Sequence, residues 1–155
     1  MDFTKAPWFD GGGTGSTFSK ILEKLRCDQK THEIHVGTDS QPVKEGYVFA
    51  TVICAYLPGG GAYYFVSRHS TKEKKYKSLG VRLNRESELS IILADLVRSN
   101  LSNPVITVHA DVSPDPINKS SKYTKQIQNF IKSMGFECMV KPDSWASFVA
   151  DKHAK

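Results

Sequence analysis

The chain has 155 residues, of which 39% are hydrophobic and 24% are charged. This length and composition fit one folded domain and argue against wholesale disorder. No apolar run approaches the roughly 20 residues of a membrane span, and the start MDFTKAPWFDGGG lacks the features of a signal peptide. The three cysteines are widely spaced and suit neither a disulfide framework nor a zinc site, so we expect a protein of the reducing cytoplasm, away from membranes.

The net charge of +5 is concentrated in one segment. Residues 68–85 carry seven cations against one acid, which gives +6, and subtracting this from +5 leaves −1 for the rest of the chain. Such a patch can hold phosphates by charge and counterion release. We predict a basic loop whose nucleic-acid-binding residues, with Tyr76 available for stacking, are Lys72, Lys74, Lys75, Tyr76, Lys77 and Arg82. The alternative is a solvated loop that only aids solubility.

Residues 1–16 are expected to be a tail, because a run of glycines cannot hold one conformation cheaply. The stretch GGGTGST lacks the Gly-Lys-Ser/Thr ending of a phosphate-binding P-loop. A short helix is predicted over residues 17–26, where apolar residues recur at helical spacing. We therefore divide the chain into a tail with a short helix, residues 1–30, and one domain, residues 31–155.

The rest of the chain alternates between strand and helix signals. Predicted in order are strands 32–41, 46–61 and 62–70, a helix 84–100 capped by Asn84, a strand 104–114, a helix 120–135, a strand 136–142 and a helix 144–155. The second and third strands follow each other directly and should form a hairpin. The order βββαβαβα predicts an α/β fold with a mixed five-stranded sheet flanked by helices.

Two aspartates end predicted strands in the same way. Asp39 follows Ile34, Val36 and Thr38, and Asp111 follows a similar alternation that ends at Ala110. Because strand side chains alternate, each aspartate lies on the face opposite its apolar neighbours, and both converge if the two strands are adjacent. Such proximity favours a cation between the carboxylates. Taken singly, either aspartate could merely begin a turn.

The helix predicted at 84–100 offers two acids, Glu86 and Glu88. At about 100° per residue, Glu86 lies at the edge of the apolar stripe that faces the sheet, whereas Glu88 lies on the polar side with Asp95. Glu86 is therefore the acid that can reach inward. Both could also favour the positive N-terminal end of the helix.

The last two acids differ in their local setting. Asp143 directly precedes helix-like sequence, so capping that helix is its expected role. Asp151 lies inside the final helix, with Phe148 three residues before it, and has no obvious local structural duty.

Four segments together resemble the RNase H-like superfamily, and in particular the YkuK-like family of small uncharacterised bacterial proteins. They are VGTDSQ at the end of the first strand, NRESELS opening a helix, VHADVSP ending the fourth strand, and ADKHA in the last helix. The resemblance covers roughly residues 31–155, and its βββαβαβ order agrees. It implies a catalytic, metal-binding set that holds two Mg²⁺ or Mn²⁺ ions, formed here by Asp39, Glu86, Asp111 and Asp151.

The resemblance implies a metal-dependent nuclease that acts on RNA, RNA–DNA hybrid or structured DNA. On that pattern Asp39 would bridge the two ions, and His109 or His153 could orient a ligand or carry a proton. A packed strand histidine is the simpler interpretation of His109. The alternative function is a non-catalytic nucleic-acid-binding module with an RNase H fold, since the fold hosts many functions.

Overall fold

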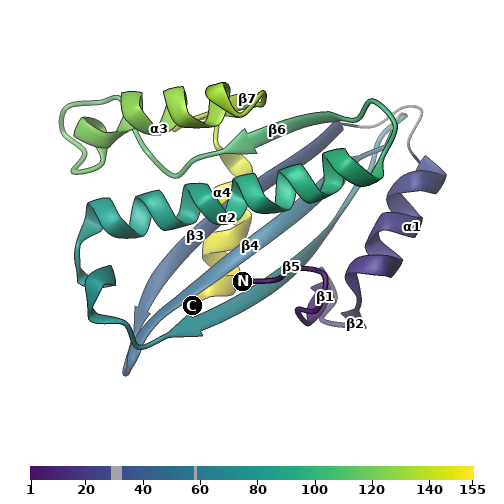
Figure 1. The fold of residues 1–155 in the computed structure, drawn as a ribbon, viewed down its shortest axis with the longest axis horizontal. Coiled ribbons are helices and arrows are strands. Elements are labelled where there is room, and N and C mark those ends of the chain that lie inside the picture. The colour runs from purple at the N-terminus through teal and green to yellow at the C-terminus, as the bar shows by residue number, and fades with distance from the viewer. Residues whose placement is uncertain (29–32, 58) are drawn as a thin grey trace.

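The strands of the chain form one mixed sheet with helices on its faces (Figure 1). This computed structural model describes residues 1–28, 33–57 and 59–155. Its elements are β1 (Trp8–Asp10), β2 (Gly15–Ser16), α1 (Phe18–Asp28), β3 (Glu33–Val43), β4 (Gly46–Tyr56), β5 (Ala62–Thr71), the 3₁₀ turn η1 (Lys74–Lys77), α2 (Leu79–Asn100), β6 (Val105–His109), α3 (Ser121–Ser133), β7 (Glu137–Met139) and α4 (Trp145–Ala154). None of the described helices is long and apolar enough to cross a membrane.

The sheet has the order β2-β1-β5-β4-β3-β6-β7. β3, β4 and β5 form an antiparallel meander, whereas β6 runs parallel to β3 and β7 runs parallel to β6. The α/β fold with a mixed sheet is confirmed. β3 and β6, the strands that lead to Asp39 and Asp111, are adjacent, which is the condition under which the two carboxylates were expected to converge. The predicted number of strands is wrong, because the sheet has seven strands rather than five.

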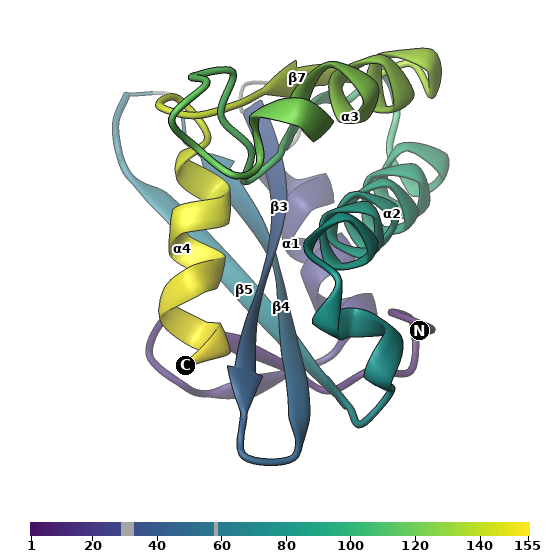
Figure 2. The same cartoon turned by 90° about the vertical axis from the view of Figure 1, so that its left-hand side faces the viewer.

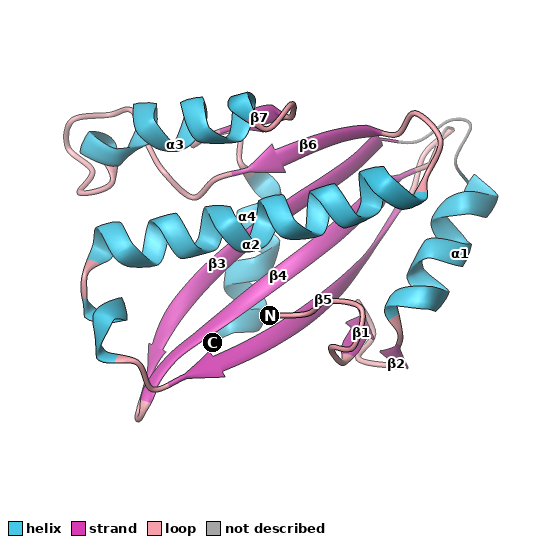
Figure 3. Cartoon of the chain, in the orientation of Figure 1, coloured by secondary structure: helices cyan, strands magenta, loops and turns pink. Residues whose placement is uncertain are grey.

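The two additional strands lie in the segment that was expected to be a tail. β1 pairs with both β2 and β5, so residues 1–16 extend the edge of the sheet (Figure 3). The anchor is apolar: Phe3 and Trp8 are buried, and the indole Nε1–H of Trp8 donates a hydrogen bond to the Phe3 carbonyl at 3.0 Å. The glycine run forms the turn between the strands, where the Asp10 carboxylate accepts hydrogen bonds from the Gly12 and Thr14 amides. Burial of two large aromatic side chains fixes a segment whose glycine content favours disorder.

Helices α2 and α4 lie on opposite sides of β3 and β4 (Figure 2). The side chains at even positions of β3 face α2, as shown by the 2.8 Å hydrogen bond between the Thr38 and Ser90 hydroxyls. Gly37, at an odd position, faces α4 at very short range, because a Cβ placed on it would lie 2.8 Å from the backbone of Ala146 and Ser147. The alternation of β3 therefore directs Asp39 toward the α4 side.

Several predicted boundaries differ from the structure. α2 begins at Leu79 after the N-cap residue Ser78, not at Asn84, and α4 has Ser144 rather than Asp143 at its N-cap. The basic segment is consequently not an open loop, since η1 and the first turns of α2 occupy much of it (Figure 3). β3 continues past Asp39 to Val43, and β4 ends at Tyr56. The predicted domain boundary at residues 30 and 31, the predicted strand start at residue 32 and Pro58 lie outside the described residues.

Candidate metal and nucleic-acid site

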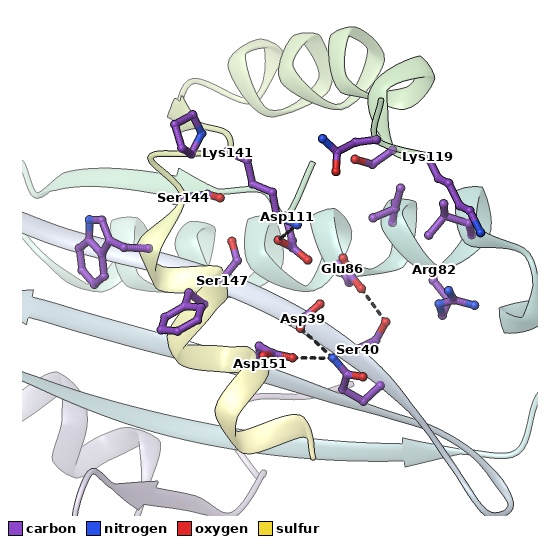
Figure 4. A pocket seen from close by; sticks show the side chains of 18 residues that line it. Asp39, Ser40, Arg82, Glu86, Asp111, Lys119, Lys141, Ser144, Ser147 and Asp151 are labelled. Atoms are coloured by element: carbon purple, nitrogen blue, oxygen red, sulfur yellow. Dashed lines mark hydrogen bonds and ion pairs between the residues drawn. The ribbon is translucent and has the colours of Figure 1, made fainter. Parts of the chain in front are cut away.

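A pocket of about 840 Å³ lies where β6 stops and β3 continues. β6 ends at His109, opposite Gly37, so the last six residues of β3 have no β6 neighbour. Residues of β3, α2 and α4, and of the connections that follow β6 and β7, form its walls (Figure 4). An early strand end thus opens the sheet where both of its faces can contribute side chains.

The four predicted acids all line this pocket. Asp39 comes from β3, Glu86 from α2, Asp111 from the turn after β6, and Asp151 from α4 (Figure 4). Extending the register of β3 and β6 by two residues brings Asp111 level with Asp39. Glu86 reaches the same pocket from the opposite side of the sheet, because beyond His109 no β6 residue lies between Glu86 and the two aspartates.

The two glutamates of α2 have different surroundings. Glu86 is 6% exposed and accepts a hydrogen bond from the Ser40 hydroxyl of β3. Glu88 is exposed and pairs with Arg85 at 3.2 Å on the outer side of the helix. The helical period that placed Glu86 toward the sheet thus corresponds to the observed orientation.

Burial and like charge dominate the electrostatics of Asp39 and Glu86. Asp39 is 6% exposed. Its burial, the charge of Asp111 and a hydrogen bond with Asp151 raise its pKa to about 8. Burial, followed by the charge of Asp39, raises the pKa of Glu86 well above its usual value, although the Ser40 hydrogen bond opposes this. Both carboxyl groups are held where their negative form is poorly compensated by protein.

The other two acids already have cationic partners. Lys141 Nζ lies 3.0 Å from Asp111, and Lys155 Nζ lies 3.0 Å from Asp151. The Gln41 amide donates to Asp151 and, at 3.5 Å, to Asp39 (Figure 4). Burial opposes ionisation of Asp151, but hydrogen bonds led by that of Lys155 hold its pKa below the usual value.

The donor set fits hard divalent cations, which prefer carboxylate oxygens. A cation between Asp39 and Glu86 would relieve the repulsion that raises their pKa values. Another observation points to a ligand: the Ser147 hydroxyl lines the pocket, is 1% exposed and has no hydrogen-bond partner. Among the residues that the structure describes, however, no group of three or more His, Cys, Asp or Glu side chains is already arranged to hold a metal ion.

The structure corrects the role expected of Tyr76. This side chain is 6% exposed and packs edge-on against Phe49 of β4, with ring centroids 5.0 Å apart. η1 turns the ring inward, so Tyr76 is not presented for stacking on bases. Composition alone could not show this, because the apolar partner lies 27 residues earlier in the chain.

The basic side chains of this segment fall into two groups. Arg82 lines the pocket, where its guanidinium donates to the Tyr76 carbonyl at 2.7 Å and lies 5.0 Å from the centre of the Tyr47 ring. The four lysines of the predicted set are exposed. Lys72, Lys74 and Lys77 lie beside the β3–β4 turn, where Lys72 pairs with Glu45, and Lys75 pairs with Glu73. Their exposure leaves these side chains accessible to a polyanion; they are Lys72, Lys74, Lys75 and Lys77.

Sequence reasoning missed several residues of the pocket. Lys119 and Lys141 lie in the connections before α3 and α4, far along the sequence from the basic segment, and both line the pocket (Figure 4). Ser147 and Phe148 come from α4. The helical spacing of Phe148 relative to Asp151 was the one available signal for any of them.

The two histidines considered for catalysis have structural partners. His109 is buried, lies 2.8 Å from the His35 ring nitrogen and accepts a hydrogen bond from the Ala146 amide at 3.3 Å. Burial and the neighbouring His35 lower the pKa of His109 to about 3, so it stays neutral and acts as a packed strand histidine. His153 contacts the Tyr64 hydroxyl at 3.1 Å and is not among the pocket-lining residues.

Comparison with known proteins adds a family to this geometry. The sequence model described as Ribonuclease H-like matches residues 16–155, which is most of the chain. The chain belongs to the Ribonuclease H-like family. It is also 24% identical to a protein of Bacillus subtilis (strain 168) named "Uncharacterized protein YkuK", over 85% of this chain and 87% of that protein. No solved structure matches the chain. Membership of this family supports a role related to nucleic acid.

Proposed function

We propose that the protein is a metal-dependent nuclease that hydrolyses phosphodiester bonds of RNA, RNA–DNA hybrid or structured DNA. The observation that carries the proposal is the meeting of four acidic side chains, from four separate segments, in one pocket rimmed by cations. A binding module has no need to gather carboxylates where it must also accept phosphates, because the two repel each other. A site that gathers carboxylates is suited to bind the divalent cations through which phosphates can then be held.

The residues proposed to hold two Mg²⁺ or Mn²⁺ ions are Asp39, Glu86, Asp111 and Asp151. Divalent cations bound in such a carboxylate site supply the charge that activates water and stabilises the leaving oxygen of a phosphodiester. Burial of Asp39 and Glu86 keeps bulk water from screening that charge. Ser147 adds an unpartnered hydroxyl that can hydrogen-bond to a ligand oxygen.

The cations of the pocket give the chain its own means of holding the substrate. Arg82, Lys119 and Lys141 come from three different segments and line the same pocket. Their positive charges can bind phosphate oxygens on either side of the scissile bond and so orient the backbone toward the acids. The Lys141 ammonium lies 3.0 Å from the Asp111 carboxylate. A phosphate bound by Lys141 would therefore lie beside the acids.

A second candidate is a nucleic-acid-binding module without catalytic activity. Two observations favour it. Lysines 141 and 155 already occupy two of the carboxylates, and the described residues include no ready-made metal-ligand group. In such a module Lys141 and Lys155 would balance the charge of the carboxylates in place of metal ions, and nucleic acid would bind at the rim of the pocket.

Cleavage and metal binding separate the two functions. We suggest testing single-stranded RNA, RNA–DNA hybrid, single-stranded DNA, duplex DNA and branched DNA with Mg²⁺, with Mn²⁺ and with EDTA. The nuclease should cleave at least one substrate only with metal, and Mn²⁺ should raise its melting temperature. Asp39→Asn should remove both effects, whereas Asp143→Asn, a change of an exposed aspartate outside the pocket, should keep them. Nucleic-acid binding with no cleavage and no metal-induced shift would establish the binding module instead.

A further inference from the structure

The pocket contains an exposed aromatic side chain that neither the metal site nor the core uses. Phe148 of α4 lines the pocket and is 61% exposed, the highest value among aromatic side chains in the described ranges. Single exposed apolar residues are common and need no explanation by themselves. Phe148 is different because it lines the pocket that also contains the four acids.

The helical spacing of α4 connects this ring to the acidic site. Trp145, Phe148 and Asp151 follow each other at intervals of three residues, so each is a neighbour of the next on the helix surface. All three line the pocket, and the buried Ser147 lies next to Phe148 in the chain. The close contact between Gly37 and the backbone of Ala146 and Ser147 fixes this part of α4 against β3. The ring is therefore held near Asp151 by a well-packed helix.

One cation contacts the ring and two others line the same pocket. Lys152 Nζ lies 4.8 Å from the centre of the Phe148 ring, and Lys141 and Lys119 line the same pocket. A flat apolar ring among cations offers a stacking surface for a base next to binding positions for its phosphates. This is the combination by which proteins hold single strands.

We propose that Phe148 stacks on an unpaired base and makes the site selective for single-stranded nucleic acid, an inference that rests on the proposed function. A base within a duplex has both faces covered by neighbouring bases, so it has no face to offer to the ring. The substrates that fit are therefore single strands or the unpaired parts of structured molecules. Phe148 acts here as a specificity-determining residue that positions the nucleotide whose backbone lies at the acids.

Equilibrium binding tests the inference without requiring cleavage. Fluorescence anisotropy, in EDTA and again with Ca²⁺ as a hard cation that carboxylates bind, would use a labelled 12-nucleotide single strand, as RNA and as DNA, and the duplex of the same sequence. Loss of one base–aromatic stack predicts that Phe148→Leu weakens single-strand binding by roughly 5- to 150-fold. Phe148→Trp should restore it, because the ring is retained. Phe130→Leu is the matched control, since Phe130 is an exposed aromatic of α3 outside the pocket.

The duplex serves as the internal comparison, and its affinity should change little in Phe148→Leu. Single-strand affinity equal to that of the wild type in Phe148→Leu, an equal loss for the duplex, or no measurable single-strand binding by the wild type would each overturn the inference. Melting temperatures of the variants check that folding is unchanged. The two proposals fail separately: Phe148-dependent binding without cleavage refutes only the nuclease, and cleavage that ignores Phe148 refutes only the stacking role.

Discussion

Replacing Asp39 by Asn should stabilise the metal-free protein at neutral pH. The carboxyl group of Asp39 has an ordinary pKa of 3.8 and a pKa of about 8 in the folded chain. The difference between 3.8 and a working pH of about 7 is roughly 3 units, which at 1.36 kcal/mol per unit corresponds to about 4 kcal/mol. This is an upper limit, because Glu86 and Asp111 contribute to the same repulsion. We expect a gain of about 2–4 kcal/mol, or a rise in melting temperature of about 5–15 °C.

The dependence on pH gives this prediction its sign. Between the two pKa values the folded protein binds the Asp39 proton more tightly than the unfolded chain does, so the contribution of Asp39 to the free energy of unfolding falls as pH rises from about 4 to about 8. Above the folded pKa the decrease levels off. Asn cannot ionise, so the gain in Asp39→Asn should be near zero at about pH 4 and grow toward pH 8.

Thermal and urea unfolding in EDTA would measure the gain at several pH values, with Asp143→Asn as the control. The control should match the wild type throughout, because Asp143 is exposed. Added Mn²⁺ should stabilise the wild type but not Asp39→Asn, and so reduce or reverse the difference. A variant that is less stable than the wild type in EDTA at neutral pH would refute the reasoning, since it would show that the Asp39 carboxylate is well compensated.

Three further changes test separate parts of the molecule. Glu86→Gln should abolish cleavage and the metal-induced rise in melting temperature, whereas Glu88→Gln should leave both unchanged; the reverse result would show that the wrong glutamate was assigned. Gly37→Ala should lower the free energy of unfolding by about 1–3 kcal/mol, because the added Cβ would lie 2.8 Å from the α4 backbone. Urea unfolding would measure the loss. Gly15→Ala is the control, because a Cβ at that position would have no atom within 4 Å. Equal stabilities of the two glycine variants would contradict the close packing of α4. Serine in place of Lys72, Lys74, Lys75 and Lys77 should weaken nucleic-acid binding and reduce the slope of its salt dependence by about 0.7 per lost phosphate contact on single strands. Stability should be nearly unchanged, because the ion pairs of these lysines are exposed. An unaltered salt slope would indicate that the lysines serve only solubility.

The central elements and three acids of the pocket were accessible from the sequence because simple periods govern them, whereas Asp151 was assigned through the family resemblance alone. Alternation in the strands before Asp39 and Asp111 showed that their carboxylates share a face. The helical period placed Glu86 inward and Glu88 outward, as the burial of the first and the exposure of the second show. Such arguments need only local geometry, so they survive errors of several residues in the element boundaries.

What the sequence did not show depends on contacts between distant segments. The burial of Tyr76 requires Phe49, and the position of Lys141 beside Asp111 depends on the path of the chain between β7 and α4. The opening of the pocket depends on where β6 ends, because only there can α2 reach the acids of the other face. Neither composition nor periodicity carries that information.

The strands at the start of the chain also protect the molecule. β5 is ten residues long, and residues Phe9 and Asp10 of β1 pair with its edge. A bare strand edge can pair with another molecule and begin aggregation. A shortened protein that starts after residue 16 would expose both this edge and the apolar surface that Phe3 and Trp8 cover. We therefore expect such a protein to self-associate, even though every acid of the pocket would still be present.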